Sequence, residues 1–418
     1  VGLQAEDPSI ATVLKSLGYA TGQFGKNHLG DQDKFLPTVH GFDEFFGNLY
    51  HLNAEEEPED RDYPPEKDFP NFRKNMGPRG VLHCKSDGKG GQTVVDTGPL
   101  TKKRMQTIDD EVTAKTVDFI KRQNAAGIPF FVWFNTTHMH FRTYAKPESL
   151  GQSGRWQSEY HDVMIDHDKA IGVLLDLLVE LNIVDDTFVM YSTDNGPHCN
   201  SWPDAGTTPF RSEKNTSWEG AYRVPCLIRW PGHIKPGSVS NDIVAHLDWL
   251  PTLAAIAGAP DIKEKLLAGH KMGGTTYKVH IDGFNQLDHI TGKSPSPRPG
   301  FVYWTDEGEL AALRFDNWKC VFMEQRVMGT CLIWAEPLVT LRAPKLFNLR
   351  TDPYEWADIT SNTYYDWWMS HAFILIAAQP LVAQFLATFV DFPPRQKAAS
   401  FSLSSVLEKM QQTGSGGA

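Results

Sequence analysis

Cysteine is scarce in this chain of 418 residues, and two other features are missing from it. The five cysteines are too few for a disulfide scaffold, and none forms a Cys-x-x-Cys pair. No unit repeats at a period of roughly 20 to 50 residues, which excludes solenoids and propellers. No long basic block occurs, and 40 Lys and Arg stand against 51 Asp and Glu. The charge balance therefore argues against nucleic acid or an anionic membrane surface as a partner.

Long uninterrupted apolar runs are also absent. The most apolar stretch, Ala372 to Val390, is interrupted by glutamine, proline and threonine. At this length, with polar residues inside, it predicts a buried amphipathic C-terminal helix and no transmembrane span. The sequence opens at Val1 with neither an initiating Met nor a charged-then-apolar leader, so we expect the true beginning of the protein to lie outside it.

The remaining sequence alternates helical patterns with short strands. Helical spacing and capping residues predict helices over Asp7–Gly18, from Thr107 onward, and over Ser158–Leu181. Short runs rich in aromatic and branched residues predict strands at Tyr19–Phe24, Pro129–Asn135, Thr187–Thr193 and Tyr222–Trp230. Strands that are apolar on both faces and separated by helices indicate an α/β fold, with a mostly parallel central sheet and helices on both faces.

The pattern changes near residue 299. Phe301–Trp304, Leu310–Arg314 and Trp318–Met323 are separated by short turn sequences, which is typical of antiparallel hairpins. We therefore predict two units. An α/β catalytic domain covers residues 1–298, and a smaller antiparallel sheet with the terminal helix covers residues 299–418.

The stretch from Asn53 to Lys103 shows no sustained period. It is rich in Glu, Asp, Pro, Lys and Gly, so we expect an irregular excursion over the surface, of a length that often borders a binding site. Within it, the run Glu55–Glu57 is interpreted as a solvated turn, because charge runs are usually solvated.

Polar residues follow three of the predicted strands. Lys26 and His28 come after the first strand, the pair His138 and His140 after the second, and Asp194-Asn195 after the third. In an open α/β sheet ligands bind beyond the carboxyl ends of the strands. These side chains are therefore expected at one edge of the sheet.

Each group also has a structural interpretation. Asp194 and Asn195 offer hard oxygen ligands for Ca²⁺ or Mg²⁺, but Asp-Asn-Gly is equally typical of an Asx turn, and a calcium shell needs about six to eight oxygens. His138 and His140 point to opposite faces of an extended segment, so one of them faces a cleft. Zinc is an alternative, although neither HExxH nor a third nearby ligand is present.

Longer motifs around these residues resemble the type I sulfatases of the alkaline phosphatase superfamily. Gly18–Leu29 (GYATGQFGKNHL) is similar to their second signature, Ser192–Gly196 (STDNG) to their metal-binding strand end, and Lys214–Pro225 (KNTSWEGAYRVP) to their second lysine segment. The similarity continues through Asp282-Gly283 and Leu346–Pro353, and the longer pattern resembles bacterial arylsulfatases.

The resemblance implies roles residue by residue. Lys26 and Lys214 would contact the sulfate oxygens, His28 would act on the hydrated nucleophile, and His140 would protonate the departing alcohol or phenol. Asp194 and Asn195 would supply part of a Ca²⁺ shell, with Mg²⁺ as an alternative. The partner implied is a small-molecule sulfate ester, and the compartment implied is the periplasm or the exterior.

The sequence departs from the family at the nucleophile. Sulfatases use a formylglycine made from the Cys or Ser of a Cys/Ser-x-Pro-x-Arg segment. None of the five cysteines begins that segment, and the nearest serine string, Ser294–Arg298, has Ser at the third position. The family's paired N-terminal aspartates, which precede Gly18, are missing too. We therefore expect the C-terminal larger part of a sulfatase, without its nucleophile. A phosphate mono- or diester hydrolase and a catalytically silent anion-binding fragment stay open as alternatives.

Overall fold

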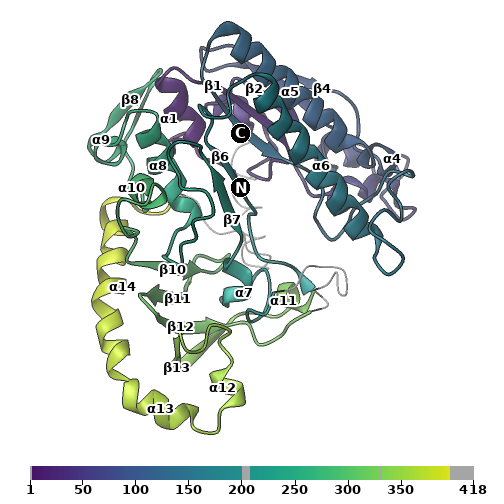
Figure 1. Cartoon of the computed structure of the whole chain (residues 1–418). Helices are drawn as coiled ribbons and strands as arrows, with labels where there is room; N and C mark the ends of the chain where they lie inside the picture. Colours follow the sequence, from purple (N-terminus) through teal and green to yellow (C-terminus); the bar gives the residue numbers. More distant parts are fainter. Residues whose placement is uncertain (1, 200–207, 330, 396–418) are drawn as a thin grey trace, which may run out of the picture.

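A mixed five-stranded sheet forms the first part of the molecule. The computed structural model describes residues 2–199, 208–329 and 331–395 (Figure 1). The strand order is β4-β3-β2-β1-β5. The bounds are β1 Ala20–Gly25, β2 Glu44–Gly47, β3 Leu82–Ser86, β4 Gln92–Asp96 and β5 Phe130–Asn135. β1 runs parallel to β2 and β5, whereas β3 and β4 are antiparallel to their neighbours.

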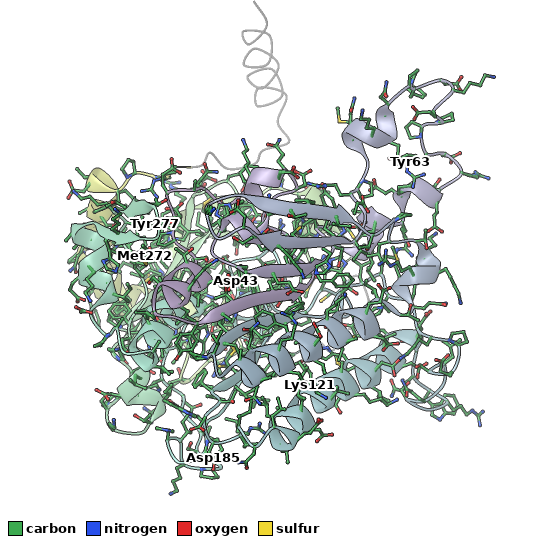
Figure 2. All side chains as sticks on the ribbon, turned by 90° about the horizontal axis from the view of Figure 1, so that it is seen from above. Asp43, Tyr63, Lys121, Asp185, Met272 and Tyr277 are labelled. Carbon is green, nitrogen blue, oxygen red and sulfur yellow. The ribbon has the colours of Figure 1, made fainter. Side chains whose placement is uncertain are left out.

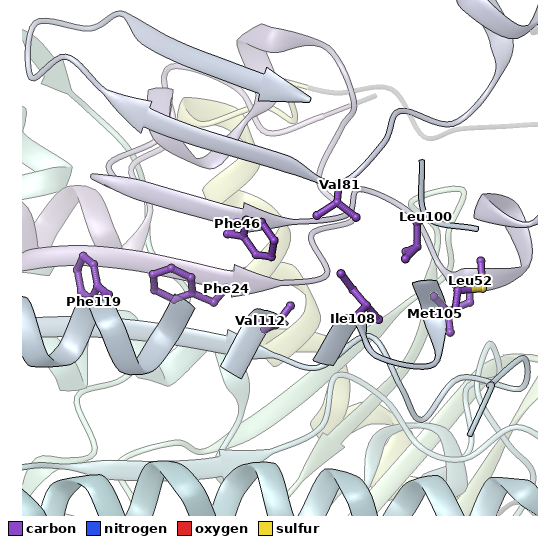
Figure 3. Packing of buried hydrophobic residues seen from close by; sticks show 9 residues of the cluster. All are labelled: Phe24, Phe46, Leu52, Val81, Leu100, Met105, Ile108, Val112 and Phe119. Atoms are coloured by element: carbon purple, nitrogen blue, oxygen red, sulfur yellow. The ribbon is translucent and has the colours of Figure 1, made fainter. Parts of the chain in front are cut away.

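Helices flank this sheet. α5 (Ile108–Ala126) packs along β1, with α6 (Glu159–Glu180) beside it, and α1 (Ile10–Ser16) packs against β1 and α8 (Trp249–Ile256). Acidic residues in the first turn of α5 complement the positive end of its dipole, and Ser158 caps α6. The core between α5 and the sheet is apolar, as Figure 3 shows; its buried members are Phe24, Phe46, Leu52, Val81, Leu100, Met105, Ile108, Val112 and Phe119.

Two short two-stranded sheets follow in the chain. β6 (Val189–Ser192) pairs antiparallel with β7 (Cys226–Arg229), and β8 (His270–Met272) pairs with β9 (Thr275–Tyr277). β5 is therefore the last strand of the five-stranded sheet, and β6 lies in a separate sheet. The short helices are α2 Leu52–Glu55, α3 Phe72–Met76, α4 Lys102–Met105, α7 Glu219–Tyr222, α9 Ile262–Ala268, α10 Leu287–Ile290, α11 Leu332–Ala335 and α12 Ala357–Thr360.

A four-stranded antiparallel sheet forms the C-terminal part. Its strands lie in chain order: β10 Gly300–Trp304, β11 Leu310–Phe315, β12 Trp318–Glu324 and β13 Val339–Asn348. Two helices follow, α13 (Tyr364–His371) and α14 (Phe373–Asp391), and Figure 1 shows α14 running along the side of this sheet.

The predicted fold class is confirmed, and α1, α5 and α6 lie within a few residues of their predicted bounds. α1 is capped by Ser9, two residues after the Asp7 at which we predicted its start. The predicted boundary between residues 298 and 299 stays a prediction, although β10 begins at Gly300.

The prediction of an irregular excursion between residues 53 and 103 was wrong in part. This stretch supplies β3 and β4, which extend the main sheet, while Figure 2 shows Tyr63 on a segment that projects from the body. Glu55 is not solvated, since it is only 5% exposed. Burial raises the pKa of this carboxyl to about 8.

The C-terminal helix forms as predicted, but its predicted burial was wrong. Ile374 and Ala378 pack on the C-terminal sheet, yet only 11% of the apolar window of α14 is buried. By length and composition α14 could cross a membrane, with a mean hydropathy of 2.0, and one such helix is weak evidence for a span.

A buried ion cluster joins the C-terminal sheet to α7. The Lys319 side chain on β12 is fully buried, and its Nζ lies 3.0 Å from Glu219 Oε1 and 2.7 Å from Glu355 Oε1. The Tyr303 hydroxyl donates to Glu219 at 2.6 Å. Burial opposes ionisation of Glu219, but the charges of Lys319 and Arg314 outweigh it and lower the pKa of that carboxyl.

Removing the central ammonium should destabilise the fold. We expect Lys319→Ala to lower the free energy of unfolding by about 3–5 kcal/mol, because the buried Glu219 and Glu355 side chains lose their shared ammonium and Glu219 keeps only Arg314 as a counter-charge. Lys271→Ala, at an exposed position of β8, is the matched control and should change it by about 0.5 kcal/mol or less. Urea unfolding followed by circular dichroism measures both, and equal midpoints would contradict this account.

Candidate active site at the carboxyl ends of the strands

The carboxyl ends of β1, β2 and β5 lie at one edge of the main sheet. Gly25 is opposite Asn135 in the register, and the Lys26 amide donates to the Asn135 carbonyl at 2.9 Å. Gly25 has a φ of 106°, and a Cβ there would lie 1.6 Å from Asn135 O, so only glycine fits. The close approach of the two strands directs the chain carrying Lys26 and His28 over this edge.

Three histidine rings gather beyond these strand ends. His28 follows β1, His51 follows β2 and His140 follows β5. The His28 and His51 ring centroids are 5.5 Å apart, and the His51 and His140 rings stack at 5.0 Å with an interplanar angle of 8°. The expectation that His28 and His140 share one edge is therefore met, but Asp194 and Asn195 follow β6, which lies in a separate two-stranded sheet and not in the main sheet as we expected. His51 was missed, because the short strand β2 before it was not recognised.

His138 lies apart from this group. Its Nδ1 is 2.6 Å from Asp109 Oδ2, at the start of α5. The charge of Asp109 outweighs the effect of burial and raises the pKa of His138. Met139 has a φ of 77°, so the segment is not extended as we assumed, but the two imidazoles still point to different surroundings. His138 has a structural partner, and His140 faces the cluster.

Lys214 reaches the same region from a different part of the chain. Its amide donates to the Pro197 carbonyl at 2.9 Å, and the Gly196 amide donates to Ala221 O at 2.8 Å. A Cβ on Gly196 would lie 1.8 Å from Gly220 O, which explains the glycine in the Asp-Asn-Gly sequence. The lysine segment and the end of β6 are thus held together.

Asp194 and Asn195 line a cavity of about 1460 Å³ together with Lys214. The exposed Asp194 carboxylate and the Asn195 amide are hard oxygen donors, which fits part of a Ca²⁺ or Mg²⁺ shell. Among the described residues no group of three or more His, Cys, Asp and Glu side chains could hold a metal. Neither a full cation shell nor the zinc alternative is assembled in that part of the chain.

The site is electropositive and holds its histidines neutral. Desolvation lowers the pKa of Lys26, and Asp194 opposes this while Lys214 adds to it. Burial, with the charge of Lys26, lowers the pKa of His140 to about 3, and burial with His28 lowers that of His51 to about 4. His28 keeps an exposed edge, yet desolvation followed by the Lys26 and Lys214 charges lowers its pKa.

This arrangement suits an oxyanion. Lys26 and Lys214 come from different elements and act on the same neutral imidazoles, so this region offers charge and hydrogen bonds to a compact anion. Trp218, close to Lys214 in the sequence, is 1% exposed and belongs to the core of the C-terminal sheet, so its ring is not available to a ligand. Phe210 is partly buried beside Tyr354.

Comparison with known proteins gives the family. The sulfatase family model matches residues 1–259. The chain belongs to the sulfatase family. Its curated relatives include canine N-acetylgalactosamine-6-sulfatase, 29% identical over 94% of this chain and 71% of that protein. Human arylsulfatase A is 28% identical over 85% of this chain and 67% of that protein.

A solved sulfatase shares the fold. The crystal structure of the PsFucS1 sulfatase from Pseudoalteromonas sp. superposes with a TM-score of 0.76 and 26% identity, over 94% of this chain and 75% of that one. The resemblance to the type I sulfatases of the alkaline phosphatase superfamily is thereby confirmed.

This sulfatase should take up protons when it binds an anion. A bound sulfate raises the pKa of neighbouring imidazoles that are neutral in the free protein, so the complex holds more protons. Affinity for sulfate should therefore rise as the pH falls from about 7 to about 5. Calorimetry of sulfate binding in buffers of different ionisation enthalpy measures the uptake.

Two matched variants test which histidine takes up the protons on sulfate binding. His140→Gln should reduce the uptake, whereas His138→Gln should leave it unchanged, because the Asp109 partner already raises the pKa of His138. Equal uptake in both variants would assign the protons to other groups.

Proposed function

We propose that this chain binds sulfate monoesters in the cluster of Lys26, Lys214 and the three histidines, as part of a sulfuric ester hydrolase. The observation that carries the proposal is the convergence of Lys26 from the main sheet and Lys214 from the segment held by the C-terminal sheet. Each lowers the pKa of His28, so both charges act on one small volume.

The two lysines suit the charge that develops during sulfate ester cleavage. Negative charge builds on the sulfate oxygens and on the leaving oxygen, and preorganised ammonium groups stabilise it. Lys26 and Lys214 contact the sulfate oxygens in this proposal. Because Lys26 is partly desolvated, its charge is screened less than that of an exposed lysine.

The histidines handle the protons. His140 is neutral in the free protein, and the bound anion raises its pKa so that it can carry a proton to the leaving alcohol. His28 lies edge-on to His51, with ring centroids 5.5 Å apart, and His51 stacks on His140. In this proposal His28 acts on the hydrated nucleophile, so the two histidines that contact His51 have separate roles.

Asp194 and Asn195 would hold part of a Ca²⁺ shell. The cation would neutralise charge on a sulfate oxygen when bound. The charge of Asp194 also opposes part of the desolvation that lowers the pKa of Lys26.

In this proposal none of the 418 residues supplies the nucleophile. The segment Ser294–Arg298 has a structural role, because Arg298 is buried and its Nη2 lies 2.6 Å from Asp248 Oδ1. Ser296 Oγ donates to Ile243 O. We therefore propose a chain that binds sulfate esters but turns them over negligibly by itself.

The binding site is tested with two lysine variants. Lys26→Ala and Lys214→Ala should each weaken phenyl sulfate binding at least about tenfold, as expected for the loss of one charge-assisted contact. Lys89→Ala, in the exposed turn after β3, is the control and should bind normally. Calorimetry measures affinity, and release of phenol measures turnover.

Phenyl phosphate serves as the comparison ligand. Tighter, lysine-independent binding of the phosphate ester, or its preferential hydrolysis, would favour a phosphate ester hydrolase. Substantial release of phenol from phenyl sulfate, abolished by Lys26→Ala, would show that the chain does contain a nucleophile. Binding of free sulfate with no turnover of either ester agrees with the proposal.

A further inference from the structure

Side-chain amides are buried in the segments that carry His28 and His51. Gln23 on β1 and Asn48, which follows β2, are fully buried, and Asn27 is 4% exposed. Lys26 and His28 stand on either side of Asn27, and both are more exposed than it is. Asn27 is therefore the inward-facing residue of the Lys-Asn-His sequence.

Asn27 holds this segment through three hydrogen bonds. Its Nδ2 donates to Gln23 Oε1 at 3.0 Å, and its Oδ1 accepts from the Leu29 amide at 2.9 Å. Its backbone amide donates to Asn48 O at 2.8 Å. One bond lies before Lys26, one lies after His28 and one reaches the neighbouring strand end, so the segment is fixed on all sides of the lysine.

The bond between Asn27 and Gln23 sets the direction of the chain after β1. Four residues of an extended strand span about 13 Å, so the side chains at positions 23 and 27 of a straight strand would not meet. Gly25, with its φ of 106°, turns the chain between them. The side-chain bond then holds this turn, and with it the path that Lys26 takes over the edge of the sheet.

The burial of these amides is unfavourable for the stability of the fold. Gln23 Nε2 and Asn48 Oδ1 have no hydrogen-bond partner in the part of the chain that the structure describes, although both side chains are fully buried. An apolar side chain of similar size would avoid the cost of an unpaired buried polar group. Proteins keep such residues mainly where function requires them. The position of Lys26 supplies that requirement.

We propose that Asn27 is a positioning residue for Lys26, with Gln23 as the partner that holds it in place. The inference rests on the proposed function, in which Lys26 contacts the sulfate oxygens, and it adds the residues that aim this contact. A preorganised donor has to lie within about 0.5 Å of its productive position. A lysine ammonium on its flexible stem depends for this precision on where its backbone is held.

The experiment measures the affinity of the full chain for inorganic sulfate by calorimetry in double-mutant cycles. Asn27→Ala should weaken binding about three- to tenfold, as expected when one charge-assisted contact is displaced. In the Lys26→Ala background the same substitution should have an effect of about twofold or less, because Asn27 acts through Lys26. In the Lys214→Ala background it should keep its full effect, because Lys214 lies on a different segment.

A second set of variants separates positioning from folding stability. The double variant Gln23→Met/Asn27→Leu replaces both amides by apolar side chains of similar size, which should leave the urea midpoint near that of the wild type. It should still bind sulfate about three- to tenfold more weakly. Gln286→Ala is the matched control, because it removes a fully buried amide that donates to Asp248 at 3.0 Å. It should lower the urea midpoint and leave sulfate affinity unchanged.

The outcomes separate this inference from the proposed function. If Lys26→Ala weakens sulfate binding but Asn27→Ala does not, Asn27 has no positioning role and the anion site stands. An equal effect of Asn27→Ala in both lysine backgrounds also overturns the inference, because Asn27 would then act on the fold as a whole. Wild-type affinity in Gln23→Met/Asn27→Leu overturns it too. If Lys26→Ala and Lys214→Ala change no affinity, the proposed function itself fails.

Discussion

The buried ammonium of Lys319 is the contact on which the geometry of the site depends. It neutralises Glu219 and Glu355, and Glu219 begins the helix that follows the Lys214 segment. Ser217 of the same segment donates to Met323 O on β12, and Asn215 donates to Ile333 O in α11. A buried carboxylate without a counter-charge is strongly unfavourable, so this ion cluster helps to fix where the lysine segment lies. The position of Lys214, to which we assign sulfate binding, therefore depends on residues much later in the chain.

The acidic protein brings two of its positive charges close together. Acidic residues outnumber basic ones overall, yet Lys26 and Lys214 lie close enough for each to lower the pKa of the same histidines. Two like charges in a partly desolvated pocket repel each other, and Asp194 offsets part of that repulsion. The free protein thus holds an unfavourable charge arrangement that a bound anion relieves. Charges that are already in place stabilise a ligand without rearrangement of the protein.

Local rules predicted much of the fold from the sequence. Capping and periodicity located α1, α5 and α6, and turn signals located β10 to β12, because these elements are fixed by nearby residues. β3, β4 and β13 were not predicted, since their stability comes from pairing with distant strands that no local pattern reveals. The same limit applied to the site. Strand ends located Lys26, His28 and Asp194, whereas His51 joins the histidine cluster through tertiary packing. Glu55 and α14 show that composition alone does not decide burial.

The division of the strands between separate sheets has a mechanical consequence. Lys26 follows β1 of the five-stranded sheet, and the Lys214 segment is bonded to the four-stranded sheet through Ser217, so an anion held by both lysines, as we propose, would connect the two sheets. Binding of the anion would then add its free energy to that needed to separate the two sheets. Linkage is reciprocal. A change that makes the two sheets easier to separate would therefore weaken anion binding by the same free energy.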